Sequence, residues 1–201
     1  MLARVSTLRD RKKERTRQAL VVAAGRLFAE QGYERTTVAD IAAAADIGTR
    51  TFFSYFASKE ELVFPEADAR IQATLDAIAA RGPADSPADV LLSALGGVGD
   101  EIVSPMAGLR LRLIQTVPAI RGRALQIQAD AQREIARHLR DAFPEQLDEV
   151  SAAALVGAFV GAVTGALQVL LDDPDAVAGG PAQLRERMRT AMNVALRPWA
   201  R

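Results

Sequence analysis

The stretch TTVADIAAAADIGTRTFFSYFASKEEL, residues 36–62, decides the fold. Thr36 and Thr37 are typical helix caps, and the apolar residues after them recur with helical spacing. Residues 45–48 then predict a tight turn. A second amphipathic helix follows over residues 49–56. Two short helices joined by a tight turn predict a helix-turn-helix.

The second helix is expected to turn Phe52 and Phe56 inward and to leave a polar face outside. That face carries a cation and several hydroxyls, groups suited to base edges and phosphates in a major groove. Thr49, Arg50 and Ser54 are expected to face bases, and Thr37, Tyr55 and Lys59 to face phosphates. The complete set of expected DNA contacts is Thr36, Thr37, Thr49, Arg50, Thr51, Ser54, Tyr55 and Lys59.

The charge distribution favours DNA binding over an ordinary helical bundle, in which paired amphipathic helices also occur. Residues 1–60 carry 11 Lys and Arg against 7 Asp and Glu, whereas residues 61–201 carry 14 against 18. The net charge of the whole chain is zero because a basic segment, residues 1–60, is followed by an acidic segment, residues 61–201. Affinity for phosphates depends on where the positive charge lies, so the basic segment predicts contact with nucleic acid.

Residues 16–63 resemble the DNA-binding domain of the TetR family of bacterial transcription regulators. The resemblance covers about a quarter of the chain and rests on five dense matches. Two departures lie in the turn, where Asp46 replaces the usual Gly and Gly48 the usual Ser, and Phe53 replaces the usual Tyr. Asp tolerates a left-handed φ, so the turn is expected to survive. The matching segments are Phe28–Tyr33, Thr36–Ala42, Ala45–Gly48, Phe53–Phe56 and Ser58–Leu62.

The rest of the chain predicts helices throughout, so the fold class is all-α. A basic arm to about Thr16 leads into a first helix that ends at Gly32, and a fourth helix begins at Ser58 and is interrupted by Pro65. Later helices are expected at about 86–102, 105–117, 118–143, 144–171 and 181–196. The resemblance implies a three-helix DNA-binding domain over residues 1–57 and a helical ligand-binding and dimerisation domain over residues 58–201.

Residues 152–171 contain no charged side chain and are long enough to cross a bilayer. The flanks are acidic and lack an aromatic belt, so a buried helix is favoured over a membrane span. Gly157, Gly161 and Gly165 form a ridge on which another helix can pack closely. The resemblance implies a homodimer through the last two helices, which would supply the two recognition helices that a palindromic operator needs. Candidate contacts are Leu155, Phe159, Leu184, Met188 and Met192; a core helix within one chain remains the alternative.

The resemblance also implies a small-molecule effector held by the second domain, and a repressor released from double-stranded DNA when that effector binds. A hydrophobic or amphipathic effector would suit the apolar side chains there, although most of these residues would be core in any case. The expected lining is Phe64, Ile71, Leu91, Leu95, Met106, Leu109, Leu113 and Phe159.

Other classes of function find little support in the sequence. The chain has no cysteine and a single histidine, His138, which lies among arginines, so we expect no catalytic site, no metal site and no cofactor. The amino terminus leads into a charged helix and not into an apolar signal core, which predicts a cytoplasmic protein. A helical scaffold that binds other proteins is the alternative function.

Overall fold

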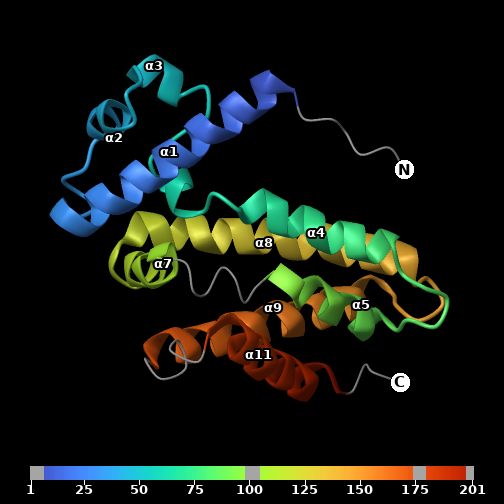
Figure 1. The fold of residues 1–201 in the computed structure, drawn as a ribbon. Helices are drawn as coiled ribbons and strands as arrows, with labels where there is room; N and C mark the ends of the chain where they lie inside the picture. Colours follow the sequence, from blue (N-terminus) through green and yellow to red (C-terminus); the bar gives the residue numbers. More distant parts are fainter. Residues whose placement is uncertain (1–6, 98–104, 174–179, 198–201) are drawn as a thin grey trace. The chain divides into compact units, whose positions relative to one another are not determined.

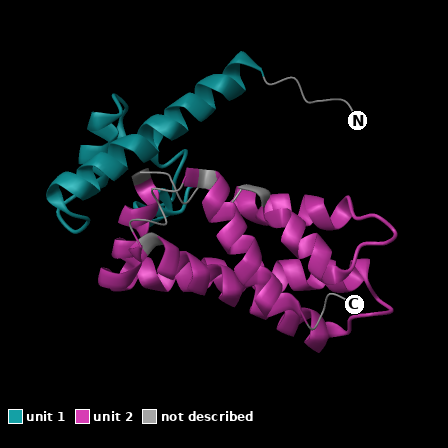
Figure 2. Ribbon diagram, turned by 60° about the horizontal axis from the view of Figure 1, so that its bottom comes forward, with its two compact units in different colours: residues 1–65 teal, residues 66–201 magenta. Residues whose placement is uncertain are grey.

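A computed structural model describes residues 7–97, 105–173 and 180–197. Within these ranges every regular element is a helix, which confirms the all-α prediction (Figure 1). The chain divides into two compact units, residues 1–65 and 66–201 (Figure 2). The division follows Pro65 and not residue 57, where the sequence placed it. The intervening residues stay with the first unit because Leu62 and Val63 are fully buried and their turn packs on the first helix.

The first unit begins with a long helix, α1 (Leu8–Gln31). The predicted arm to Thr16 is therefore mostly helical. Its start is fixed by a capping box, in which Asp10 N donates to Thr7 Oγ1 over 3.1 Å and Thr7 N donates to the Asp10 carboxylate over 3.0 Å. The helix ends at Gly32, whose φ of 85° is rare for other residues, as the sequence predicted.

The predicted helix-turn-helix is formed by α2 (Val38–Ala44) and α3 (Thr49–Phe52). Asp46 takes a φ of 55° in the turn, so the prediction that Asp tolerates this position is confirmed. The α-helical part of α3 is one turn long, and hydrogen-bonded turns extend it to Phe56. Phe52 and Phe56 point inward as expected, with 0% and 4% of their surface exposed.

The predicted fourth helix does not begin at Ser58. A 3-10 turn, η1 (Glu60–Val63), occupies this segment, and α4 (Ala67–Ala79) starts only after Pro65. In this segment the side chain of Glu61 accepts a hydrogen bond from Ala57 N over 2.9 Å. Proline lacks the backbone donor that a continuous helix would need, so it splits the helix.

The second unit packs helices around one apolar core. Helix α9 (Glu149–Asp172) lies against α8 (Pro118–Ala142) and α11 (Gly180–Leu196), and α8 also contacts α4 and α7 (Pro105–Thr116). The short α5 (Pro87–Ser93) continues as the 3-10 turn η2 (Ala94–Gly97). Part of the expected helix over 86–102 lies outside the described residues.

Helix starts in the second unit follow local capping signals. Ser86 and Asp89 form a capping box with Pro87 at the first helical position, as the sequence predicted for α5. Helix α9 starts later than the expected Pro144, because the side chain of Asp148 accepts a hydrogen bond from Ser151 N over 2.7 Å.

Within the single chain, helix α9 is buried on one side only. Leu155 and Val156 are fully buried, whereas Val150 and Val169 are 76% and 64% exposed. By length and composition alone, Glu149–Leu170 could cross a membrane, with a mean hydropathy of 2.0. Because core helices of soluble proteins meet the same criterion, this is weak evidence for a membrane span.

Candidate nucleic-acid interface

The exposed face of α3 and the turn after it carries the polar residues that the sequence assigned to DNA. The two buried phenylalanines hold this segment on the first unit, with the ring centres of Phe52 and Phe56 6.0 Å apart. The opposite side faces solvent. Thr49, Arg50, Thr51 and Ser54 are exposed, and Tyr55 is half-buried.

The same segment exposes an aromatic ring that the sequence analysis did not assign to DNA. The ring of Phe53 is 57% exposed and meets the ring of Phe52 edge-on, with centres 5.3 Å apart. Its departure from the usual Tyr was visible in the sequence, but its orientation was not. An exposed phenylalanine here can make apolar contacts with DNA, among which the thymine methyl group is a suitable partner.

Thr36 does not fit the role that the sequence gave it. Its side chain is fully buried; it donates to Gly32 O over 2.8 Å and accepts from Gln31 Nε2 over 3.2 Å. Thr36 therefore closes the end of α1 and is removed from the set of DNA contacts. Thr37 remains at the surface. It forms the capping box of α2 with Asp40: Asp40 N donates to the Thr37 hydroxyl, and Thr37 N donates to the Asp40 carboxylate.

Lys59 is half-buried, and its ammonium contacts the backbone and a ring of its own unit. Its ammonium donates to Tyr33 O over 3.1 Å and to Thr36 O over 3.2 Å, and it lies 4.1 Å from the centre of the Tyr33 ring. These contacts join η1 to the loop between α1 and α2. In this structure, Lys59 stabilises the unit that presents α3.

Tyr33 and Glu60 complete this internal cluster. Burial, together with the hydrogen bond that Tyr33 donates to Glu60, raises the pKa of the Tyr33 phenol above its usual value. Burial alone would raise the pKa of Glu60, but hydrogen bonds from Ser58 and Tyr33 and the charge of Lys59 lower it instead. The cluster therefore holds an ionised carboxylate and a neutral phenol in the pH range where the protein would work.

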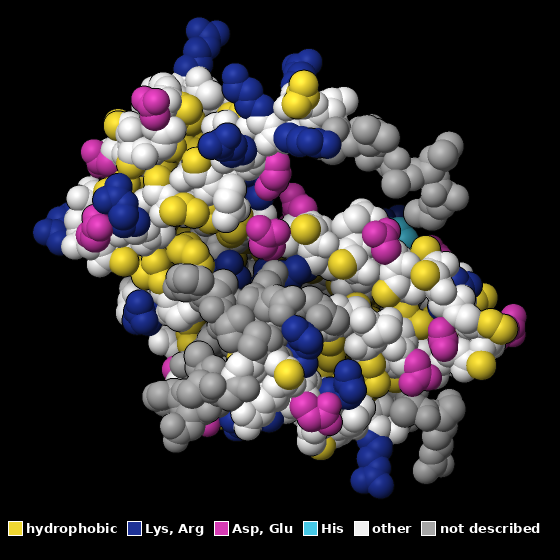
Figure 3. Space-filling model, viewed as in Figure 1, with side chains coloured by type: hydrophobic (Ala, Val, Ile, Leu, Met, Phe, Trp, Pro, Cys, Tyr) yellow, Lys and Arg dark blue, Asp and Glu magenta, His cyan; other side chains and the backbone are white. Residues whose placement is uncertain are grey.

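Positive charge is visible over the first unit as well, where Lys and Arg side chains (dark blue) stand out from its surface (Figure 3). The early turns of α1 contribute much of it, because Leu8 to Arg15 are all exposed. The sequence predicted a basic segment here, but it did not predict that the segment is helical.

The predicted effector residues are buried or half-buried apolar side chains. Leu91, Leu95 and Phe159 belong to the core cluster of the second unit. Leu109 and Leu113 are buried on α7, whereas Met106 and Ile71 are half-buried. Phe64, which is 9% exposed, belongs to the first unit.

The comparison with protein families matches residues 20–64 to "Bacterial regulatory proteins, tetR family". These residues contain the helix-turn-helix, the inward cluster around Tyr33 and the buried η1. The chain belongs to the TetR family. It is 36% identical over 138 residues to the HTH-type transcriptional regulator TcmR of Streptomyces glaucescens, a match that spans 65% of this chain and 61% of TcmR. The aligned part of this TetR-family chain thus spans less than two thirds of that relative.

Solved structures share the fold over nearly the whole chain. The SmeT–triclosan complex, SmeT being a repressor from Stenotrophomonas maltophilia, matches with a TM-score of 0.64 at 17% identity, over 93% of this chain and 92% of SmeT. Thermus thermophilus FadR in complex with lauroyl-CoA matches with a TM-score of 0.56 at 19% identity, over 90% of this chain and 93% of FadR. At this identity the likeness shows the TetR-family fold alone.

The residues expected to contact a second subunit are instead part of this TetR-family chain's own core. Leu155, Leu184 and Met192 are fully buried within the chain, and Phe159 and Met188 are 7% and 2% exposed. This burial matches the alternative of a core helix within one chain. The exposed side carries Val150, Gly161, Val169 and, on α11, Val194, which is 75% exposed.

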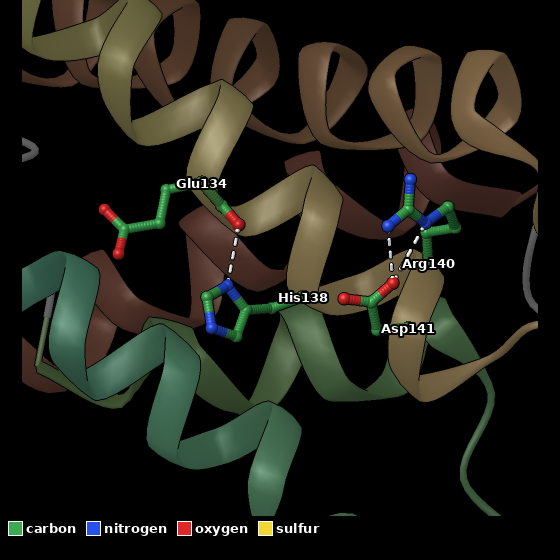
Figure 4. Close-up of polar contacts among 4 residues, drawn as sticks. All are labelled: Glu134, His138, Arg140 and Asp141. Atoms are coloured by element: carbon green, nitrogen blue, oxygen red, sulfur yellow. Dashed lines mark hydrogen bonds and ion pairs between the residues drawn. The ribbon is translucent and has the colours of Figure 1, made fainter.

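His138 lies on α8 and makes a local contact (Figure 4). Its Nδ1 is 3.0 Å from Glu134 O, one helical turn earlier, while Arg140 pairs with Asp141 over 2.6 Å. Among the described residues no group of three His, Asp or Glu side chains is placed to hold a metal ion. His138 is thus a half-buried residue whose ring contacts the backbone of its own helix.

Proposed function

We propose that this TetR-family chain is a ligand-responsive DNA-binding transcriptional regulator, which represses its target genes until a small hydrophobic or amphipathic molecule releases it from its operator. The observation that carries the proposal is the exposed polar face of α3, held outward by buried Phe52 and Phe56. Family membership and the 36% identity to the regulator TcmR support it. Such a protein would work in the cytoplasm, where the DNA is.

DNA recognition is proposed to use Arg50, Thr49 and Ser54 for base edges. Arg50 is exposed at the second position of α3, and an arginine there can donate two hydrogen bonds to guanine in the major groove. Thr37, Thr51 and Tyr55 lie at the surface around it and are proposed to contact phosphates and neighbouring base edges. Thr36 is left out because it is fully buried, and Lys59 because its ammonium already bonds two backbone carbonyls of the same unit.

The test begins with a duplex selected by the wild-type protein from a random-sequence library. Arg50→Ala should weaken binding to that duplex by about 1–3 kcal/mol and relax specificity at one position. Arg133→Ala is the matched control, because Arg133 is an exposed arginine of the second unit. A wild-type protein that selects no preferred sequence would instead favour the alternative, a helical scaffold for other proteins.

The second unit is proposed to bind the effector and a second copy of the chain. SmeT with triclosan and FadR with lauroyl-CoA share its fold, which supports an apolar or amphipathic effector. The exposed apolar side of α9 and α11 supports a homodimer that places two copies of α3 on a palindromic operator. Thermal-shift screening with phenols and acyl-CoA compounds tests the first proposal: an effector should raise the melting temperature and lower affinity for the selected duplex.

A further inference from the structure

The first three turns of α1 extend beyond the part of the chain that the family match covers. That match starts at residue 20, where Leu20 is also the first fully buried side chain of α1. Every residue from Leu8 to Arg15 is exposed. The core of the first unit therefore does not require this extension, which we define as Leu8–Ala19.

The charges of the extension oppose its own folding. It carries six Lys and Arg residues against Asp10 and Glu14, and they lie at the amino end of a helix, where the helix dipole disfavours positive charge. Arg9, Lys13 and Arg17 follow one another at four-residue spacing, so like charges repel along one side. A helix with these charges gains stability when an anion lies against it.

Two cations of this row, Lys13 and Arg17, lie beside the turn that follows α3. A groove of about 350 Å³ in the first unit is lined by Lys13 and Arg17 from α1 and by Ser54 and Tyr55. Arg17 anchors the row, because its guanidinium donates to Pro65 O and lies 5.2 Å from the centre of the Phe56 ring. Asp10 and Glu14 also line the groove, but the Asp10 carboxylate already accepts hydrogen bonds from Thr7.

We propose that Arg9 and Lys13 bind phosphates of the DNA backbone beyond the bases that α3 contacts, so that the extension lengthens the bound site. This inference rests on the proposed DNA-binding function. A strand that passes Ser54 and Tyr55 continues along the groove to Lys13 and then to Arg9, one turn earlier on the helix. Arg11 and Arg15 line a different groove, which runs toward Val22 and Ala44, so they are not part of the contact.

The experiment compares Arg9→Gln/Lys13→Gln with the matched control Arg11→Gln/Arg15→Gln, which removes the same charge from the same helix on another side. Binding is measured by fluorescence anisotropy between 50 and 300 mM salt, with a duplex selected by the wild-type protein and with the same duplex trimmed of its flanking base pairs. Each lost phosphate contact should lower the slope of log K against log salt by about 0.9. Arg9→Gln/Lys13→Gln should therefore lower it by about two for each bound protomer.

Three results support the inference together: the slope falls in Arg9→Gln/Lys13→Gln, it stays within one unit of wild type in the control, and trimming the flanks affects wild type but not Arg9→Gln/Lys13→Gln. Equal falls in both variants would overturn it, since they would indicate a general charge effect. An unchanged slope in Arg9→Gln/Lys13→Gln would overturn it as well. If the proposed DNA-binding function itself were wrong, the wild-type protein would show no preference for any selected duplex. The two failures can therefore be distinguished.

A measurement without DNA tests the charge argument independently. If the cations oppose helix formation, Arg9→Gln/Lys13→Gln should keep or increase the helical signal in circular dichroism and should melt at the same or a higher temperature. A loss of helical signal would mean that Arg9 and Lys13 stabilise the helix itself, which would overturn the inference.

Discussion

The phenol of Tyr33 donates a hydrogen bond to the carboxylate of Glu60 over 2.5 Å. This hydrogen bond joins the end of α1 to η1. The two elements are far apart in the sequence and lie on either side of the helix-turn-helix along the chain. The ammonium of Lys59 lies over the same ring, 4.1 Å from its centre, and bonds two backbone carbonyls. Three polar side chains thus hold together the unit that presents α3.

Tyr33→Phe should destabilise the first unit, because it removes a donor to a charged group and keeps the ring. The expected loss is about 1–2 kcal/mol, at the lower end for a charged hydrogen bond because Glu60 is half-buried and water can replace part of the bond. Hydrogen exchange of residues 20–64 measures it. Tyr55→Phe is the matched control and should change DNA affinity but not exchange; equal exchange in the two variants would contradict the structural role of Tyr33.

The stability of the first unit should fall in acid. The fold lowers the pKa of Glu60 despite its burial, through hydrogen bonds from Ser58 and Tyr33, and it lowers the pKa of Asp40 through Thr37. A carboxyl with a lowered folded-state pKa stabilises the fold above its unfolded pKa, about 4, and that contribution is lost as the pH falls through the folded value. Hydrogen exchange of residues 20–64 from pH 7 to pH 3 should show this loss. Glu60→Gln should show a smaller dependence on pH, and an identical dependence would be evidence against the assignment.

Lys59→Met should act on stability more than on the salt dependence of DNA binding. Its ammonium bonds Tyr33 O and Thr36 O, so the substitution leaves both carbonyls without this donor and should cost about 1–2 kcal/mol. Thermal denaturation measures the loss, and the slope of log K against log salt on a selected duplex should stay unchanged. A slope lower by about one unit would instead restore the phosphate contact predicted from the sequence.

Local signals in the sequence predicted most of the helices, and contacts between distant residues explain most of the errors. Gly32, Asp46 and Pro65 act through their own backbone, and their predicted effects are confirmed. Lys59 was assigned to DNA because its hydrogen bonds within the unit could not be predicted. They join residues 23 and 26 positions apart and depend on how the chain folds back. The start of α1 was missed although Thr7 and Asp10 carry the same capping pattern as Ser86 and Asp89.

The two sides of α9 could not be told apart from the sequence for a different physical reason. Its central twenty residues carry no charge, so no polar face marks which side meets solvent. Leu155 and Phe159 were therefore assigned to a partner although they lie in the chain's own core. The same uniform composition made a membrane span and a core helix hard to separate.

Phe53→Ala should remove a preference for thymine at one position of the selected duplex. The ring is 57% exposed beside the base-facing residues, and an apolar ring can pack against the thymine methyl group. Replacing that thymine by deoxyuridine removes only the methyl group and should weaken the wild-type protein several-fold. The same replacement should not affect Phe53→Ala. If no thymine in the duplex shows this dependence on Phe53, the ring makes no such contact.

Gly161→Leu should weaken the proposed homodimer without destabilising the protomer. Apart from the adjacent backbone of its own helix, a Cβ at Gly161 would meet no described atom within 4 Å, and the same holds at Gly122 on α8. Replacing either helical glycine should favour the helix by up to about 1 kcal/mol, so neither variant is expected to unfold. The two glycines lie on different helices. Gly161 lies on the exposed side of α9 with Val150 and Val169. A bulky side chain there would separate two packed helices. Sedimentation equilibrium should therefore show a weaker dimer for Gly161→Leu and an unchanged dimer for Gly122→Leu. An intact Gly161→Leu dimer would place the contact between subunits elsewhere on the second unit.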